Sequence, residues 1–435
     1  MTRTVLRGAR WPGDVAWSDG RITVVGSVPA EDGDEVVRVD GDIVTAGLVN
    51  THHHFYQWMT RGWAFDCTLF DWLITLYPVW AQLSPEDVEA ASAVALGELA
   101  LSGCTTAADH HYVVPGGDDS VFDAIARSAR RIGIRAHIAR GSMDLGRSKG
   151  GLPPDSVVEE LDAILSSTQA VYDRLHDGER ITVTVAPCSP FSVTTELMSE
   201  SAALARQLGV RLHTHLAETL DEEESCLARF GRRPLDVLDD IGWIASDVWV
   251  AHGIHFNDAE VSRLAETGTG IAHCPSSNCR LGSGIARVVD LTAAGAPVGL
   301  GVDGVASNEI GTLFPEMRMA LFLARQRDLA ATTFAPADAL VLATEGGARC
   351  LGRDDVGRLE PGLRADVVVW PGDDLADVLD PVAGLVLGPE RTARHVYVDG
   401  TPVVSDGHLV NADIEALHAE LARRARRLWP EQVSR

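Results

Sequence analysis

Eight short runs of β-branched or apolar residues alternate with longer segments of helical periodicity over most of this 435-residue chain. The runs are Ile43–Asn50, Thr105–Asp109, Ile134–Arg140, Ile181–Pro187, Arg211–Leu216, Val248–His252, Gly270–His273 and Val298–Asp303. The helical segments include Pro85–Leu101, Ser120–Arg131, Asp155–Arg174, Thr195–Gln207, Pro234–Asp240 and Asp258–Glu266. Strands that alternate with helices form parallel βα units, because a parallel connection needs a long crossover. An unbroken series of eight favours a closed (β/α)8 TIM barrel over an open doubly wound sheet, and no glycine-rich phosphate loop follows the first run.

The two ends of the chain have a different pattern from this central series. Residues 1–42 and the residues after Gly352 contain short alternating runs separated by Gly, Asp and Pro, which is typical of small antiparallel strands and turns. Barrel termini can lie close in space, so we expect both ends to pair into one small β-sandwich domain. We predict residues 1–45 as the first part of this β-domain, residues 46–352 as the catalytic barrel, and residues 353–435 as the second part plus a C-terminal helix.

The charge and the cysteine content of the chain bear on its binding partners and its cellular compartment. The formal charge is −25 and no long basic cluster is present, so nucleic acid is not an expected partner. The seven cysteines contain no Cys-x-x-Cys pair and predict neither a disulfide framework nor a structural zinc knot. No signal-peptide pattern and no apolar segment of membrane-spanning length occurs. We therefore expect a cytoplasmic protein with no membrane partner.

A histidine triplet ends the first apolar run, in Asn50-Thr-His-His-His54. Side chains two apart on a strand point to the same side, so His52 and His54 should project together while His53 turns away from them. Two imidazoles that share a direction form half of a metal site, since such sites need about three or four ligands. A histidine-rich loop is the alternative, and the remaining strand ends decide between the two.

Further zinc-type ligands follow three other runs, at the end where barrel enzymes have their active sites. These residues are His215, with Glu218 after it, His252 and Asp303. Three imidazoles and a carboxylate can hold one divalent ion and leave a position for water, which the ion acidifies. Glu218 can then carry protons from this water to a leaving group, and Asp303 can also accept one. The pattern indicates hydrolysis at an electrophilic carbon.

Each of these residues also has a plainer interpretation. A strand-end histidine such as His252 is more often structural, and Asp303 followed by Gly304 is by itself a turn. His213 shares a face with His215, so spacing does not choose between them. His110 and His111, after the second run, could contact the substrate or only line the pocket mouth. A barrel that binds a metal without catalysis is the alternative to an enzyme, and the intact set of ligands and glutamate argues against it.

Four motifs spread along the chain resemble those of the amidohydrolase superfamily, in its mononuclear aminohydrolase branch. They are Thr45-Ala-Gly-Leu-Val-Asn-Thr-His-His-His54, His215-Leu-Ala-Glu218, Ala251-His252-Gly253 and Gly301-Val-Asp-Gly-Val-Ala-Ser-Asn308. Ala46 departs from the proline usual in that family. The resemblance implies that His52, His54, His215 and Asp303 bind one zinc, or iron in its place. It also implies that Glu218 is the general acid and base and that His252 polarises the substrate or supports the metal site.

Three further stretches resemble particular groups of enzymes within that branch. Arg140-Gly-Ser-Met143, Ala186-Pro-Cys-Ser-Pro-Phe-Ser192 and Ala272-His-Cys-Pro-Ser-Ser-Asn278 are similar to the 8-oxoguanine deaminases, and triazine hydrolases share parts of several motifs. The resemblance implies hydrolytic deamination of free 8-oxoguanine to urate and ammonia. Guanine, a pterin or a substituted s-triazine are the alternative substrates. A homo-oligomer is expected.

Four residues near the strand ends are candidates for substrate binding. Gln57 can offer a donor and an acceptor to a purine edge, and Cys188 can face the imidazolone part of 8-oxoguanine or be a small buried hydrophobe. Trp72 can stack on the base or belong to the core. Arg140 can bind a substrate carbonyl or pair with a carboxylate of the barrel. The segment from Trp58 to Tyr77 is expected to be a loop that covers the pocket.

Overall fold

A computed structural model describes residues 3–429 of the chain. Its central element is a parallel sheet of eight strands in sequential order. The strands are β6 (Leu48–Asn50), β7 (Cys104–His111), β8 (Arg135–Ser142), β9 (Ile181–Pro187), β10 (Leu212–Leu216), β11 (Val248–His252), β12 (Gly270–His273) and β13 (Val298–Leu300). The first and last strands meet where Thr51 N–H donates to the Leu300 carbonyl at 2.9 Å and Asp303 N–H donates to the His52 carbonyl at 3.0 Å. The sheet is therefore a nearly closed barrel, which confirms the predicted fold class.

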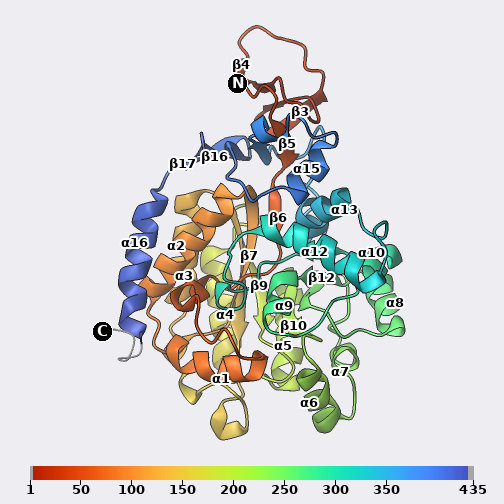
Figure 1. The fold of residues 1–435 in the computed structure, drawn as a ribbon. Coiled ribbons are helices and arrows are strands. Elements are labelled where there is room, and N and C mark those ends of the chain that lie inside the picture. The colour runs from red at the N-terminus through yellow and green to blue at the C-terminus, as the bar shows by residue number, and fades with distance from the viewer. Residues whose placement is uncertain (1–2, 430–435) are drawn as a thin grey trace.

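Helices surround this barrel in the order that the βα alternation predicts (Figure 1). They are α1 (Leu69–Trp80), α2 (Pro85–Leu101), α3 (Ser120–Ile132), α4 (Leu161–Leu175), α5 (Thr195–Leu208), α6 (Leu220–Phe230), α7 (Pro234–Asp240), α8 (Asp258–Thr267), α9 (Pro275–Arg280), α10 (Val288–Ala294), α11 (Val305–Asn308), α12 (Leu313–Asp328), α13 (Pro336–Val341) and α14 (Gly347–Cys350). Figure 1 places α1 and α6 at the end of the barrel that lies away from the small sheets. In the described part of the chain, no helix combines the length and the apolar character needed to cross a membrane.

Two small sheets lie at the other end of the barrel. The first has the order β3-β2-β1-β4, with β1 (Thr4–Arg7), β2 (Asp14–Ser18), β3 (Arg21–Gly26) and β4 (Glu35–Arg38). The second has the order β17-β16-β15-β14-β5, with β5 (Ile43–Ala46), β14 (Val367–Trp370), β15 (His395–Val398), β16 (Thr401–Ser405) and β17 (His408–Leu409). Buried side chains of both sheets form one core, in which the rings of Trp17 and Tyr397 lie 4.8 Å apart. Both chain ends therefore build the small β-sandwich together.

The predicted strand Ile43–Asn50 is two strands that belong to different sheets. Its first half, β5, pairs with β14 of the small domain, and its second half, β6, pairs with β7 of the barrel. Gly47 lies between them, where a Cβ atom would approach the Thr105 hydroxyl oxygen to 2.1 Å. Only glycine allows the backbone to pass so close to Thr105. The apolar run is therefore continuous in sequence, but it leaves the small sheet at Gly47 and enters the barrel.

The remaining elements are α15 (Pro381–Leu387) and α16 (Ile414–Ala425). The helix α16 lies along α2 of the barrel (Figure 1). Gly97 of α2 makes this approach possible, because a Cβ there would lie 3.0 Å from the Ile414 side chain. The last predicted range, 353–435, thus contacts both the small sheets and the barrel. The boundaries at 45/46 and 352/353 stay a prediction.

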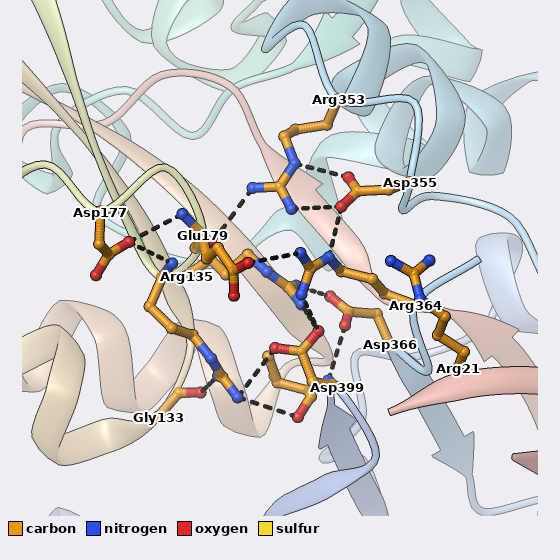
Figure 2. A network of polar contacts seen from close by, with 12 residues as sticks. Arg21, Gly133, Arg135, Asp177, Glu179, Arg353, Asp355, Arg364, Asp366 and Asp399 are labelled. Carbon is orange, nitrogen blue, oxygen red and sulfur yellow. Dashed lines mark hydrogen bonds and ion pairs between the residues drawn. The ribbon is translucent and has the colours of Figure 1, made fainter. Parts of the chain in front are cut away.

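A buried network of arginines and aspartates connects the small β-domain to the barrel (Figure 2). Arg135, at the start of β8, pairs with both Asp366 and Asp399 of the C-terminal segment. Arg364 reaches Asp399 at 3.0 Å, and Arg180 reaches the same carboxylate at 3.1 Å. The side chains of Arg135 and Asp366 are both only 1% exposed, so each depends on the other for compensation of its charge.

Replacing Arg135 by alanine is expected to lower the free energy of unfolding by about 3–5 kcal/mol, because it leaves the Asp366 carboxylate buried without the cation that compensates its charge. Urea denaturation followed by circular dichroism measures the change. Arg38→Ala is the control, since Arg38 pairs with Asp40 at an exposed site and should cost at most about 1 kcal/mol. Equal effects of the two substitutions would contradict this role of the network.

Candidate metal and active site

Four ligand-type side chains converge at the carboxyl ends of the barrel strands. His52 and His54 follow β6, His215 lies in β10, and Asp303 follows β13. The Nε2 atoms of His54 and His215 are 3.2 Å apart, and Asp303 Oδ1 lies 3.2 Å from His54 Nε2 and 3.5 Å from His52 Nε2. A tetrahedral zinc with bonds near 2.0–2.1 Å holds its ligands roughly 3.3 Å apart. These separations therefore fit one divalent ion.

The hydrogen bonds of His54 and His215 direct one ring nitrogen of each toward this point. His54 Nδ1 lies 2.6 Å from the carbonyl oxygen of His110, and His215 Nδ1 lies 2.7 Å from that of Cys188. A carbonyl only accepts, so each Nδ1 carries the proton and each Nε2 presents its lone pair. Carbonyl partners of this kind fix the tautomer and the orientation of metal-binding histidines.

His52 is oriented by a second histidine. His213 Nδ1 lies 2.9 Å from the Trp249 carbonyl oxygen and donates to it, so His213 Nε2 is free to accept from His52 Nδ1 at 2.8 Å. The Nε2 of His52 has no hydrogen-bond partner among residues 3–429, although the side chain is fully buried. A buried nitrogen without a partner is costly unless an absent ligand binds it. The donor set therefore fits a metal, with His213 as the support of His52.

The charges of the cluster suit an ion as well. Burial lowers the pKa of His52 and of His215 well below the usual value, which keeps both rings neutral as metal binding requires. Burial acts to raise the pKa of Asp303, but the hydroxyls of Ser277 and Ser307 donate to its Oδ2 and stabilise the ionised carboxylate. The site thus combines neutral imidazoles with an ionised carboxylate.

Asp303 is held in an unusual backbone conformation by its surroundings. Its φ angle is +62°, which is uncommon for a residue with a side chain. Its second carboxylate oxygen, Oδ2, accepts hydrogen bonds from the hydroxyls of Ser277 at 2.6 Å and Ser307 at 3.0 Å. These contacts leave Oδ1 to face the histidines. Backbone strain maintained by such contacts is common at functional sites.

Glu218 and His252 face each other across the same pocket. His252 Nε2 lies 3.6 Å from Glu218 Oε2, and His252 Nδ1 lies 2.9 Å from the Asn278 side-chain oxygen, which orients the ring. Burial, together with the nearby charge of Asp303, raises the pKa of Glu218 well above its usual value. A buried carboxyl group whose pKa is raised in this way is suited to general acid and base chemistry.

Glu218, His252 and the ligand-type residues His54, His215 and Asp303 line one pocket. Its walls consist of the ligand-type residues together with apolar and aromatic side chains: His54, Gln57, Leu69, Trp72, Leu73, Tyr77, Tyr112, Cys188, Phe191, His215, Glu218, His252, Leu281 and Asp303. His53 is buried beside Phe55 and is not part of this lining, as predicted. The pocket is thus an apolar, aromatic chamber with the polar groups at its base, a composition typical of small-molecule sites.

A sequence model of the Amidohydrolase family matches residues 43–403 of the chain. The chain belongs to this family. It is 50% identical to the 8-oxoguanine deaminase of Pseudomonas aeruginosa over 96% of its own length and 97% of that protein. It is 40% identical to the hydroxydechloroatrazine ethylaminohydrolase of Pseudomonas sp. (strain ADP), over 83% of this chain and 78% of that one. The zinc complex of atrazine chlorohydrolase from Arthrobacter aurescens TC1 superimposes with a TM-score of 0.92 at 31% identity, over 97% of this chain and all of that one.

Three of the four predicted substrate-binding residues line the pocket of this amidohydrolase. The side-chain amide of Gln57 lies against Gly304, where a Cβ would come within 1.7 Å of Gln57 Oε1, and both of its polar atoms lack partners among the described residues. The indole of Trp72 donates to the Ala306 carbonyl at 3.0 Å. Burial raises the pKa of the Cys188 thiol to about 12, so the thiol is neutral. The side-chain amide of Gln57 therefore keeps its donor and its acceptor available to a ligand in the pocket.

Arg140 lies outside the lining of the pocket. Its guanidinium pairs with Glu159 at 2.8 Å, donates to the Ser167 hydroxyl oxygen at 3.0 Å and lies over the Phe122 ring. Of the two interpretations of this residue, the structure supports the pair with a barrel carboxylate and does not bring the side chain to a substrate carbonyl.

Several residues of the site were not predicted from the sequence. The segment from Trp58 to Tyr77, expected as a loop, contains a short 3-10 helix and most of α1, whose inner face supplies Leu69, Leu73 and Tyr77 to the pocket. The spacing of its apolar residues was a usable helix signal. Tyr112 directly follows β7 and could have been found by the strand-end rule that identified His215.

Proposed function

We propose that this protein catalyses the zinc-dependent hydrolytic deamination of 8-oxoguanine to urate and ammonia. The observation that carries the proposal is the convergence of the free Nε2 atoms of His52, His54 and His215 on Asp303, beside the buried Glu218. The 50% identity to an 8-oxoguanine deaminase over nearly the whole chain supports the choice of substrate. The class is broader than this substrate: the protein is an aminohydrolase of the amidohydrolase superfamily.

The proposed metal ligands are His52, His54, His215 and Asp303, since their donor atoms have the separations and protonation states that zinc requires. Zinc bound there would acidify a water molecule and polarise the substrate. Asp303 Oδ1 is placed to ligate and to accept a proton from that water, because its Oδ2 is already occupied by two serine hydroxyls.

Glu218 is proposed to move the protons of the reaction. It takes one proton from the water and delivers it to a ring nitrogen. The second proton of the water, which Asp303 accepts as the added oxygen becomes a carbonyl, goes to the amine that leaves as ammonia. Water and 8-oxoguanine thereby become urate and ammonia without a further reactant. His252, whose Nε2 faces Glu218 at 3.6 Å, is assigned to polarise the oxygen that is added to the ring.

Recognition of the base is assigned to groups farther from the metal ligands. The free amide of Gln57 can donate to and accept from the purine edge, and it has no competing partner among the described residues. Trp72 and Phe191 provide aromatic surface for the base, and the neutral thiol of Cys188 is proposed to face its imidazolone portion. Arg140 has no part in this assignment.

The decisive experiment combines metal analysis with a urate absorbance assay on 8-oxoguanine. We expect one zinc per chain and formation of urate together with an equal amount of ammonia. No turnover at any zinc loading would identify a silent metal-binding barrel and overturn the proposal.

A second candidate is the same reaction on another amino-heterocycle, such as guanine, a pterin or a substituted s-triazine. It is supported by the 40% identity to a hydroxydechloroatrazine ethylaminohydrolase and by the structural likeness to a zinc-bound atrazine chlorohydrolase. A screen of aminated purines, pterins and triazines for ammonia release distinguishes the candidates. A larger kcat/KM for a triazine than for 8-oxoguanine would favour the second.

Replacing Cys188 by alanine is expected to lower kcat/KM for 8-oxoguanine more than for guanine, because the two bases differ at the imidazolone portion that the thiol is proposed to face. The differential loss should be roughly 10-fold, as for one lost polar contact of about 1.4 kcal/mol. Cys226→Ala, at a buried cysteine in α6 outside the pocket lining, serves as the control. An equal loss on both substrates would remove Cys188 from the specificity argument.

A further inference from the structure

A second buried glutamate, Glu222 of α6, binds the backbone that carries Glu218. Its Oε1 accepts the N–H of Ala217 at 3.0 Å, and its Oε2 accepts the N–H of Glu218 at 2.9 Å. The side chain is fully buried and does not line the pocket. Burial raises the pKa of Glu222 to about 7, so placing a carboxylate here has a cost that the two backbone hydrogen bonds offset.

This contact differs from ordinary capping of a helix. Thr219 is the N-cap of α6, and its hydroxyl accepts the N–H of Glu222 at 3.2 Å. In a capping box, the glutamate at the third helical position would return to the N–H of the N-cap itself. Glu260 does this in α8, where it accepts the N–H of Asn257 at 2.7 Å. Glu222 instead accepts the N–H groups of Ala217 and Glu218, the two residues before the N-cap Thr219.

The peptide that Glu222 holds also connects Glu218 to His252. Ala217 has a φ angle of +51°, a conformation that needs support in a residue with a side chain. Its carbonyl accepts the N–H groups of Ile254 at 2.9 Å and His255 at 3.1 Å, which directly follow the His252 segment. One turn therefore sets the position of Glu218 relative to His252.

We propose that Glu222 is a positioning residue, which fixes the Ala217–Glu218 backbone so that the Glu218 carboxylate stays within 3.6 Å of His252 and faces the metal ligands. The inference rests on the proposed function of Glu218 as the proton carrier. Catalytic groups must be held to within about 0.5 Å, and a misplacement of about 1 Å can cost roughly 100-fold in rate. A carboxylate with two acceptor oxygens matches this task, since it supplies one acceptor to each of the two N–H groups of these buried residues.

The test compares Glu222→Gln with Glu260→Gln, the same substitution at the equivalent position of the next capped helix. Glutamine presents one oxygen and one NH2 group, so one of the two N–H groups loses its acceptor. Glu222→Gln is expected to lower kcat roughly 10- to 100-fold, with zinc content and KM close to those of the wild type. Glu260→Gln should leave kcat unchanged, although it also weakens the ion pair with Arg233.

The rates are measured on whichever amino-heterocycle the wild-type zinc enzyme hydrolyses fastest, so failure of 8-oxoguanine as the substrate leaves the comparison intact. A crystal structure of zinc-loaded Glu222→Gln provides a readout without turnover: the Glu218 carboxylate should lie away from its 3.6 Å contact with His252. Glu222→Asp, which keeps the charge but is shorter, should show a smaller loss of the same kind if glutamine impairs folding. An unmoved Glu218, or equal loss of kcat in the Glu222 and Glu260 variants, overturns the proposal.

Discussion

Replacing Glu218 by glutamine is expected to reduce kcat by roughly 10³- to 10⁴-fold, because the amide cannot carry a proton between water and the ring nitrogen. The zinc content should stay close to that of the wild type, since the distances around Asp303 place Glu218 outside the proposed ligand set. Steady-state kinetics of urate formation and metal analysis of the same preparation measure the two quantities.

Glu224→Gln is the matched control for this experiment. Glu224 is an exposed glutamate of α6, six residues along the chain, so the substitution makes the same chemical change away from the pocket. Its kcat should equal that of the wild type. Loss of zinc in Glu218→Gln would show that Glu218 is a ligand and would refute its assignment as the proton carrier.

The barrel and the position of its site could be predicted because the relevant information is local. Strands buried on both faces are rich in apolar and β-branched residues, and catalytic side chains lie at or just after their ends, as His52 and His54 follow β6. The change of sheet at Gly47 could not be predicted in this way. It depends on the close approach to Thr105, a residue 58 positions along the chain.

The choice between residues of one face also depends on contacts that spacing does not contain. His213 and His215 share a side of β10, and only their partners separate them: His213 bonds to His52, whereas His215 bonds to a carbonyl and directs its Nε2 to the cluster. Arg140 illustrates the same limit, because its partner Glu159 lies 19 residues further along, near the end of the connection between β8 and α4. Local sequence patterns predict which residues are candidates for the site. Hydrogen bonds formed in the folded structure determine which of these candidates face the metal cluster or the pocket.

Replacing His215 by alanine is expected to abolish zinc binding at stoichiometric metal and to remove detectable turnover. The substitution deletes one of the three imidazoles of the proposed ligand set, whose Nε2 lies 3.2 Å from that of His54, a separation that fits the ligands of a tetrahedral ion. Metal analysis after gel filtration and the urate assay check both outcomes. His408→Ala, at an exposed histidine of β17, should retain full zinc and full activity.

His213→Ala should lie between these extremes, because His213 only orients His52 through the 2.8 Å bond between their ring nitrogens. Outer partners of this kind typically contribute 10- to 100-fold in metal affinity or activity, so we expect zinc affinity or kcat to fall by roughly that factor. Comparison of the two substitutions tests directly whether His215 binds the metal and His213 only orients His52. If His213→Ala lost the metal completely while His215→Ala retained it, the assignments of the two residues would have to be exchanged.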